Sequence, residues 1–170
     1  MDKKKLYVFL DVDGVLNNTS TFRLNRKTMY VLSHENLVAY QFLIDKLKEK
    51  YDVKVILSST WRMYKTGLNK LSKFSKKYSG LKLYGKTPDG VDYREVEIRD
   101  FCDNHNIDYD DILIIDDELI SNELQKRHLK TNCHDGLRFS DVMNWLEKEW
   151  LNEINIFRFK FWWELPHIIY

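Results

Sequence analysis

The sequence has little cysteine and no long hydrophobic run, and each shortage argues against a class of protein. Its two cysteines, Cys102 and Cys133, are too few for a disulfide framework and suit a reducing cytoplasm. The apolar run near the start covers only Leu6 to Leu10, which is too short for a secretory signal. No later stretch is long enough to span a bilayer. We therefore expect a cytoplasmic protein without a membrane partner.

The formal net charge of +1 hides an uneven distribution of charged residues. From Val53 to Pro88 there are nine basic residues and no acid, whereas from Asp89 to Glu123 there are thirteen acids against two arginines. This asymmetry suggests one basic lobe and one acidic lobe suited to a metal. A solvated helix face is the simpler explanation for the lysines. The length of 170 residues fits one domain with a real core.

Short apolar runs alternate with amphipathic segments along the chain. The runs rich in β-branched and aromatic residues predict strands at 6–10, 53–57, 81–84 and 112–115. Apolar spacing predicts helices from a Ser33 cap through Leu47, then at 65–78, 93–105, just after Ser121, and at 140–152. Residues 17–33 and 85–90 are predicted to be loops. The alternation is typical of an α/β fold with a mainly parallel sheet flanked by helices.

Polar residues follow three of these strands, at the point where each strand ends. They are Asp11 and Asp13, Ser58 and Ser59, and Asp116 and Asp117. Ligand sites in open α/β sheets lie beyond the carboxyl ends of the strands, so we expect these three groups to meet at one edge.

Carboxylates gathered in this way favour a phosphoryl-transfer site that uses Mg²⁺. Like charges packed this closely are costly unless a cation neutralises them, and Mg²⁺ prefers oxygen ligands. Asp11 can attack phosphorus to give an aspartyl-phosphate, which is an established use of a carboxylate nucleophile. Gly14 permits the tight turn after Asp13. Ser58 and a cationic side chain would then hold the phosphoryl oxygens.

These motifs, in this order, resemble the haloacid dehalogenase (HAD) superfamily of phosphatases. The family's first motif matches Asp11 to Leu16, its second matches Val55 to Ser58, and its fourth matches Ile114 to Asp117. Three further segments are similar to the HAD domains of RNA-repair proteins and to the phosphatase domain of phage polynucleotide kinase. They are Ser58-Ser59-Thr60-Trp61-Arg62, Arg94-Glu95-Val96-Glu97-Ile98 and Asp135-Gly136-Leu137. The resemblance covers about Leu6 to Trp150.

The resemblance implies a Rossmann-like HAD fold and a role for each matched residue. Asp11 would be the nucleophile and a Mg²⁺ ligand. Asp13 would be the general acid for the leaving oxygen and later the base for water, and its backbone carbonyl would also bind the metal. Ser58 would bind the phosphoryl group, and Asp116 and Asp117 would complete the metal site.

The third motif is where the chain departs from the family, which usually has a lysine there. Arg94 is the best match, with Lys86 as a fallback, and an arginine can clamp phosphate oxygens bidentately. Ser59, Arg62 and Lys86 are further candidates for substrate binding. Simpler roles remain open, because Ser58 and Ser59 could cap the following helix. Likewise, Arg62 and Arg94 could only pair with nearby carboxylates.

The spacing between motifs leaves no room for a full cap domain, and uncapped members of the superfamily tend to act on macromolecules. We expect residues 1–152 to form a phosphatase domain that acts on phosphorylated polynucleotide ends in nucleic-acid repair. The alternatives are a phosphatase for small (deoxy)nucleotides and a non-catalytic HAD-like binding module. Residues 153–170 form an aromatic-rich extension that either packs on the core or makes a homodimer surface.

Overall fold

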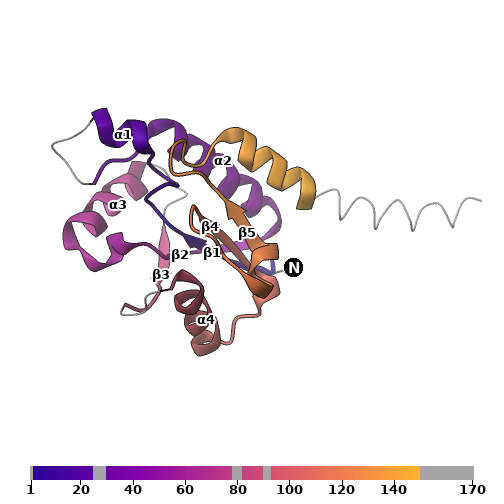
Figure 1. Cartoon of the computed structure of the whole chain (residues 1–170). Coiled ribbons are helices and arrows are strands. Elements are labelled where there is room, and N and C mark those ends of the chain that lie inside the picture. The colour runs from indigo at the N-terminus through magenta and orange to yellow at the C-terminus, as the bar shows by residue number, and fades with distance from the viewer. Residues whose placement is uncertain (1, 25–29, 78–81, 90–92, 150–170) are drawn as a thin grey trace, which may run out of the picture.

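The computed structural model describes residues 2–24, 30–77, 82–89 and 93–149, and there a parallel sheet lies between two layers of helices (Figure 1). The strands are β1 (Lys5–Leu10), β2 (Asp52–Leu57), β3 (Leu83–Lys86), β4 (Ile112–Asp116) and β5 (His128–Lys130). The α-helices are α1 (Thr19–Leu24), α2 (His34–Lys50), α3 (Lys65–Lys77) and α4 (Arg94–His105). The 3-10 helices are η1 (Thr60–Met63), η3 (Tyr109–Asp111) and η4 (Asn122–Arg127). Residues 139–149 are also helical, and the 153–170 extension lies outside the described residues.

The strand order is β3-β2-β1-β4-β5, and every neighbouring pair is parallel. β1 is central, and its last residue, Leu10, stands in register with Leu57 on one side and Ile115 on the other. The sheet confirms the predicted α/β class, and the strands predicted at 6–10, 53–57 and 112–115 correspond to β1, β2 and β4. The carboxyl ends of these three strands therefore meet at one edge.

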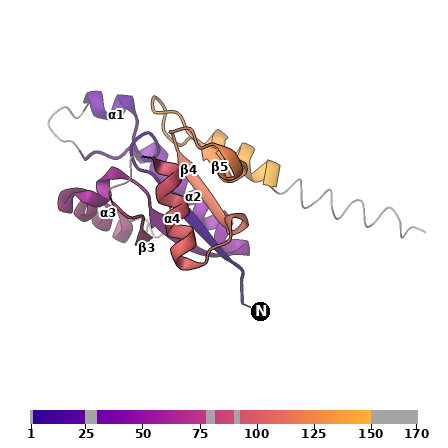
Figure 2. The ribbon, with the colours of Figure 1, turned by 60° about the horizontal axis from the view of Figure 1, so that its bottom comes forward.

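Alternating side chains of the strands supply two separate cores. On β1, Leu6, Val8 and Leu10 face a core shared with α2, α3 and the 139–149 helix. Phe9 faces the opposite core, which α4 covers (Figure 2). Because strands buried on both faces cannot alternate with polar residues, the sequence of β1 reads as one continuous apolar run.

The predicted helices are confirmed where the structure describes them. The Ser33 side chain accepts a hydrogen bond from the Asn36 backbone N–H and so caps α2. In α3, Leu71 is buried as its spacing predicts, while the side chains of Leu68 and Phe74 pack partly buried on the same core. α4 ends at Asn106, whose left-handed backbone (φ 53°) stops the helix.

Two local predictions are corrected by the structure. Residues 17–33 do not form a continuous loop, because Thr19–Leu24 is helical and the Asn18 side chain accepts hydrogen bonds from Thr21. The third strand is Leu83–Lys86, two residues later than the predicted 81–84, because Gly85 and Lys86 pair with β2. The segment after Ser121 is the 3-10 helix η4, and the short strand β5 follows it without a sequence signal.

The strand ladder continues past the strand ends and brings the polar residues side by side. The Ser58 backbone N–H donates to the Leu10 carbonyl at 2.8 Å, and that of Asp11 donates to Ile115 at 3.0 Å. Among the described residues, no separate cap domain covers this edge, as the motif spacing predicts. No helix in the described part of the chain has the length and apolarity needed to cross a membrane.

Candidate active site

A tight turn after β1 presents Asp11 and Asp13. Val12, which lies between them, is buried, and its carbonyl accepts the backbone N–H of Leu16 at 2.8 Å. Gly14 has φ +72°, a conformation that favours glycine. A Cβ atom at Gly14 would clash with the carboxylate of Asp117, so a larger residue here would force that side chain to move. The turn therefore depends on Gly14, as predicted, and it packs directly against the acidic pair that follows β4.

Three carboxylates gather at this edge of the sheet. Ligand atoms of Asp11, Asp116 and Asp117 lie within 4.8 Å of one another. Asp11 and Asp116 are buried, and the ion-pair partner of Asp116 Oδ2 among the described residues is Nε of Arg94 at 2.9 Å. Three carboxylates whose oxygens lie this close together form a donor set that fits a hard divalent cation such as Mg²⁺.

The electrostatics of the cluster also fit a cation. Burial raises the pKa of Asp11 well above its usual range, and the neighbouring Asp116 raises it further. Burial likewise raises the pKa of Asp116 to about 6, although Arg94 opposes the shift. The pKa of Asp117 is raised by burial as well. The cluster is thus poorly neutralised by its own side chains, and a bound cation would favour the ionised form of all three carboxylates.

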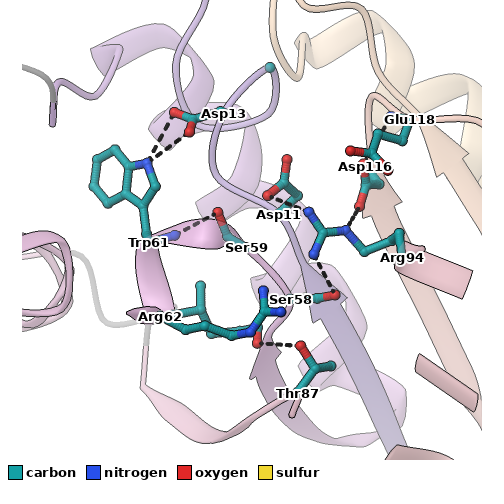
Figure 3. A network of polar contacts seen from close by, with 12 residues as sticks. Asp11, Asp13, Ser58, Ser59, Trp61, Arg62, Thr87, Arg94, Asp116 and Glu118 are labelled. Carbon is teal, nitrogen blue, oxygen red and sulfur yellow. Dashed lines mark hydrogen bonds and ion pairs between the residues drawn. The ribbon is translucent and has the colours of Figure 1, made fainter. Parts of the chain in front are cut away.

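Arg94, the first residue of α4, lies between Asp11 and Asp116 (Figure 3). Its Nη2 is 3.4 Å from Oδ1 of Asp11, and its Nε is 2.9 Å from Oδ2 of Asp116. Its Nη1 also donates to the Ser58 hydroxyl at 3.5 Å. The side chain is only 8% exposed, so its charge acts in a largely dehydrated setting. Arg94, and not Lys86, contacts Asp11 in the part of the chain that the structure describes.

Both serines after β2 lie at the site, and Ser59 also caps the following helix, which was the alternative to substrate binding. Ser58 and Ser59 are buried. The Ser59 side chain accepts a hydrogen bond from the Trp61 backbone N–H and caps η1. It also hydrogen-bonds the carboxylate of Asp11 and so lowers the pKa of Asp11. Ser59 therefore contacts the predicted nucleophile directly.

The family comparison agrees with this geometry. Residues 7–142 match the model of the HAD domain in Swiss Army Knife RNA repair proteins. The chain belongs to this HAD family. The match spans most of the chain and supports phosphohydrolase chemistry and a link to RNA repair. No curated protein shows significant sequence similarity to the chain.

Asp13 of this HAD domain is held by two side chains that have no role in the sequence prediction. The indole Nε1–H of Trp61 lies 3.0 Å from each oxygen of the Asp13 carboxylate (Figure 3). The Asn17 amide donates to the same carboxylate at 2.7 Å. Trp61 lies in a segment that resembles RNA-repair HAD domains, which is the one sequence signal that pointed to it.

Two predicted substrate-binding residues lie away from the acidic cluster. Arg62 is buried, and its guanidinium pairs with Glu97 and with Asp89, the latter at 3.0 Å. Lys86 is exposed and lies 3.7 Å from Asp89. Arg62 thus has the ion-pairing role that was the alternative to phosphate contact. Glu97 is a further buried charged residue to which the sequence prediction assigned no role.

A cavity of about 260 Å³ opens above the acidic cluster. Its described wall consists of Asp11, Asp13, Gly14, Thr19, Phe22, Thr60, Arg94, Asp117, Glu118 and Cys133. The predicted nucleophile, the predicted general acid and Arg94 therefore face one common space.

Proposed function

We propose that this HAD domain is a Mg²⁺-dependent phosphomonoesterase that works through an aspartyl-phosphate on Asp11. The observation that carries the proposal is the position of Arg94, whose guanidinium contacts the carboxylates of Asp11 and Asp116 and the hydroxyl of Ser58. A guanidinium and a hydroxyl beside a buried carboxylate form a phosphoryl-binding site next to a nucleophile.

The reaction would proceed in two displacements at phosphorus. In the first, a carboxylate oxygen of Asp11 forms a bond to phosphorus, the ester P–O bond breaks, and the leaving oxygen takes the proton of Asp13. In the second, Asp13 removes a proton from water, whose oxygen attacks phosphorus and releases inorganic phosphate from Asp11. The hydrogen bonds from Trp61 and Asn17 would keep Asp13 in place through both steps.

The metal site would be formed by side chains from two strand ends. Asp11, Asp116 and Asp117 would hold Mg²⁺, and the resemblance to the HAD superfamily adds the backbone carbonyl of Asp13. The ion would neutralise charge on the phosphoryl oxygens. Ser58 and Arg94 would bind those oxygens from the opposite side, because both lie on the β2 and α4 side of Asp11.

We propose that the substrate is a phosphorylated polynucleotide end. The absence of a cap domain among the described residues supports this, because a polymer end needs an open approach. The cavity wall also contains Phe22, which is 37% exposed and can stack on a base. Nearby surface residues, including Tyr64 and Lys65, are exposed and suit contacts with bases and backbone. The family's occurrence in RNA-repair proteins points the same way.

The first test is hydrolysis of p-nitrophenyl phosphate with and without Mg²⁺. We expect activity that requires Mg²⁺ and falls by about a thousandfold or more in Asp11→Asn. Asp110→Asn is the matched control, because Asp110 is an exposed acid that pairs with Lys126 away from the site. Equal inactivity of wild type and Asp11→Asn, with oligonucleotide binding retained, would show a binding module in place of an enzyme.

The second test addresses the substrate. Oligonucleotides of RNA and DNA with 3′- or 5′-phosphates are compared with mononucleotides by kcat/KM. We expect a preference for one class of oligonucleotide end. A strong preference for mononucleotides would replace the polynucleotide proposal with the small-nucleotide phosphatase. A cytoplasmic location and a homodimer through residues 153–170 remain proposals, the latter on residues outside the described part of the chain.

A further inference from the structure

Glu97 lies between two arginines on the side of the site away from the cavity. Its Oε2 is 2.9 Å from Nη1 of Arg94, and its Oε1 accepts a hydrogen bond from Nη2 of Arg62. The residue is 5% exposed and is not part of the described cavity wall. Glu97 therefore has no route to a substrate and can act on the reaction only through its neighbours.

Arg62 anchors Glu97 from the other side. Its Nε donates to Asp89 at 3.0 Å, and its Nη2 donates to the carbonyl of Pro88 at 3.1 Å. The Arg62 side chain is 3% exposed. Positive and negative groups thus alternate from the loop after β3 to the acidic cluster. The order is Asp89, Arg62, Glu97, Arg94, and then Asp11 with Asp116.

The contacts of Arg94 show how this series of ion pairs acts on its guanidinium. Three carboxylates share its guanidinium, since Asp116 contacts Nε, Asp11 contacts Nη2 and Glu97 contacts Nη1. Two of them, Asp11 and Asp116, belong to the acidic cluster. Among the described residues, the other partner of Nη1 is the Ser58 hydroxyl at 3.5 Å. Without the negative charge of Glu97, the pull of Asp11 and Asp116 would be less opposed, and the guanidinium could rotate further onto these two carboxylates.

We infer that Glu97 and Arg62 are positioning residues that fix the guanidinium of Arg94 in the orientation that binds a phosphoryl group. This inference rests on the proposed phosphoryl-binding role of Arg94. Arg62, a predicted substrate-binding residue, then affects the substrate only through Glu97 and Arg94. Because the pair acts through Arg94, its effect on phosphate binding must vanish when Arg94 is absent.

The test is a double-mutant cycle read by binding of inorganic orthophosphate in the presence of Mg²⁺, measured by calorimetry on the full chain. Glu97→Gln keeps the shape of the side chain and removes its charge. We expect orthophosphate to bind about tenfold more weakly to Glu97→Gln than to wild type. In the Arg94→Ala background, Glu97→Gln should cause no further loss. Additive losses in the double variant would overturn the inference.

Glu95→Gln is the matched control, because Glu95 lies on the same helix and pairs with Arg99 at 2.8 Å, away from the cluster. It should leave orthophosphate binding unchanged, and Glu97→Asp, which keeps the charge, should restore part of the affinity. If Glu97→Gln does not fold, Arg62→Lys replaces it in the same cycle. Lysine keeps the positive charge but lacks the several guanidinium N–H donors that bind Glu97 and Asp89 together. An unchanged affinity in Arg62→Lys would then count against the inference.

Binding and hydrolysis separate the two proposals. If wild type binds orthophosphate through Arg94 but hydrolyses no phosphomonoester, the proposed enzymatic function fails while the cycle still decides the role of Glu97. If wild type hydrolyses phosphomonoesters and Glu97→Gln matches it in KM, kcat and orthophosphate affinity, the positioning role fails while the enzymatic function stands. Failure of wild type to bind orthophosphate overturns the positioning role, whereas hydrolysis of p-nitrophenyl phosphate decides the enzymatic function by itself.

Discussion

The indole N–H of Trp61 lies 3.0 Å from each carboxylate oxygen of Asp13, so the proposed general acid is held by a side chain from the neighbouring strand end. The Trp61 ring is buried and packs edge-on against Tyr30, with ring centroids 5.0 Å apart. This donor therefore has a fixed position. It restrains the orientation of Asp13 while leaving its carboxylate in the cavity wall.

Trp61→Phe should lower kcat for p-nitrophenyl phosphate by about tenfold and leave KM nearly unchanged, because the variant loses the donor to Asp13 but keeps the ring. Steady-state kinetics measure both constants. Trp145→Phe is the control, since Trp145 packs on the hydrophobic core, whereas the described donors to the Asp13 carboxylate are Trp61 and Asn17. A rise in KM with an unchanged kcat would contradict a role for Trp61 in the chemical step.

Gly14→Ala should destabilise the protein and weaken Mg²⁺ binding. The new Cβ would clash with the carboxylate of Asp117, and the backbone φ of +72° alone costs an alanine about 1 kcal/mol. Urea unfolding and Mg²⁺ titration measure the two effects. Gly85→Ala is the matched control, because its Cβ would meet Phe101 at an ordinary 3.4 Å. Equal effects of the two substitutions would show that Asp117 yields without cost.

Mg²⁺ should raise the thermal stability of the wild type, since a ligand that binds only the folded state stabilises it. At ten times the dissociation constant the gain is about 1.4 kcal/mol. Asp117→Asn removes one carboxylate of the cluster and should reduce this gain. Differential scanning calorimetry with Mg²⁺ or EDTA measures it, with Asp110→Asn as the control. A gain that persists in full in Asp117→Asn would place the ion elsewhere.

The Mg²⁺-free protein should lose stability as the pH rises from about 4 to about 6, owing to Asp116. Folding raises the pKa of Asp116 from 3.8 to about 6, so in this interval the folded state binds more protons than the unfolded state. The free energy of unfolding then decreases with pH, by up to about 3 kcal/mol for this group. Urea unfolding in EDTA measures the profile.

Asp116→Asn isolates this contribution, because asparagine has no proton to release in that interval. The difference in unfolding free energy between wild type and Asp116→Asn should change with pH over the interval and level off above it. Saturating Mg²⁺ should flatten the difference by favouring the ionised carboxylate. A difference that is constant with pH in EDTA would mean that the pKa of Asp116 is not raised by folding.

Phe22→Ala should raise KM for phosphorylated oligonucleotides by about tenfold, because stacking of a base on an aromatic ring contributes about 1–3 kcal/mol. Glycerol 2-phosphate, which has no base, should be hydrolysed with unchanged kcat/KM. Leu119→Ala is the control, since Leu119 is 82% exposed and lies outside the described cavity wall. An equal loss on both substrates would show that Phe22 shapes the cavity and does not contact a base.

Much of the site followed from local sequence pattern. A continuous apolar run that ends in a polar residue indicates a strand buried on both faces, and the carboxyl ends of parallel strands must meet at one edge. The proximity of Asp11, Ser58 and Asp116 was therefore predictable, as was the need for glycine at position 14. The resemblance to the HAD superfamily then supplied the roles of these residues and pointed to Arg94.

Other features depend on partners that are distant in sequence. β5 (His128–Lys130) is too short to carry a pattern of its own and exists through pairing with β4. Arg62 and Lys86 have the charge that suits phosphate. In the folded protein, however, Arg62 forms an ion pair with Glu97, and Lys86 forms one with Asp89. A charged side chain pairs with the opposite charge that the fold places nearest to it, and the sequence alone does not show which residue carries that charge. The sequence by itself thus determined which carboxylates gather at this edge of the sheet, while the tertiary structure decided which residues hold them in position.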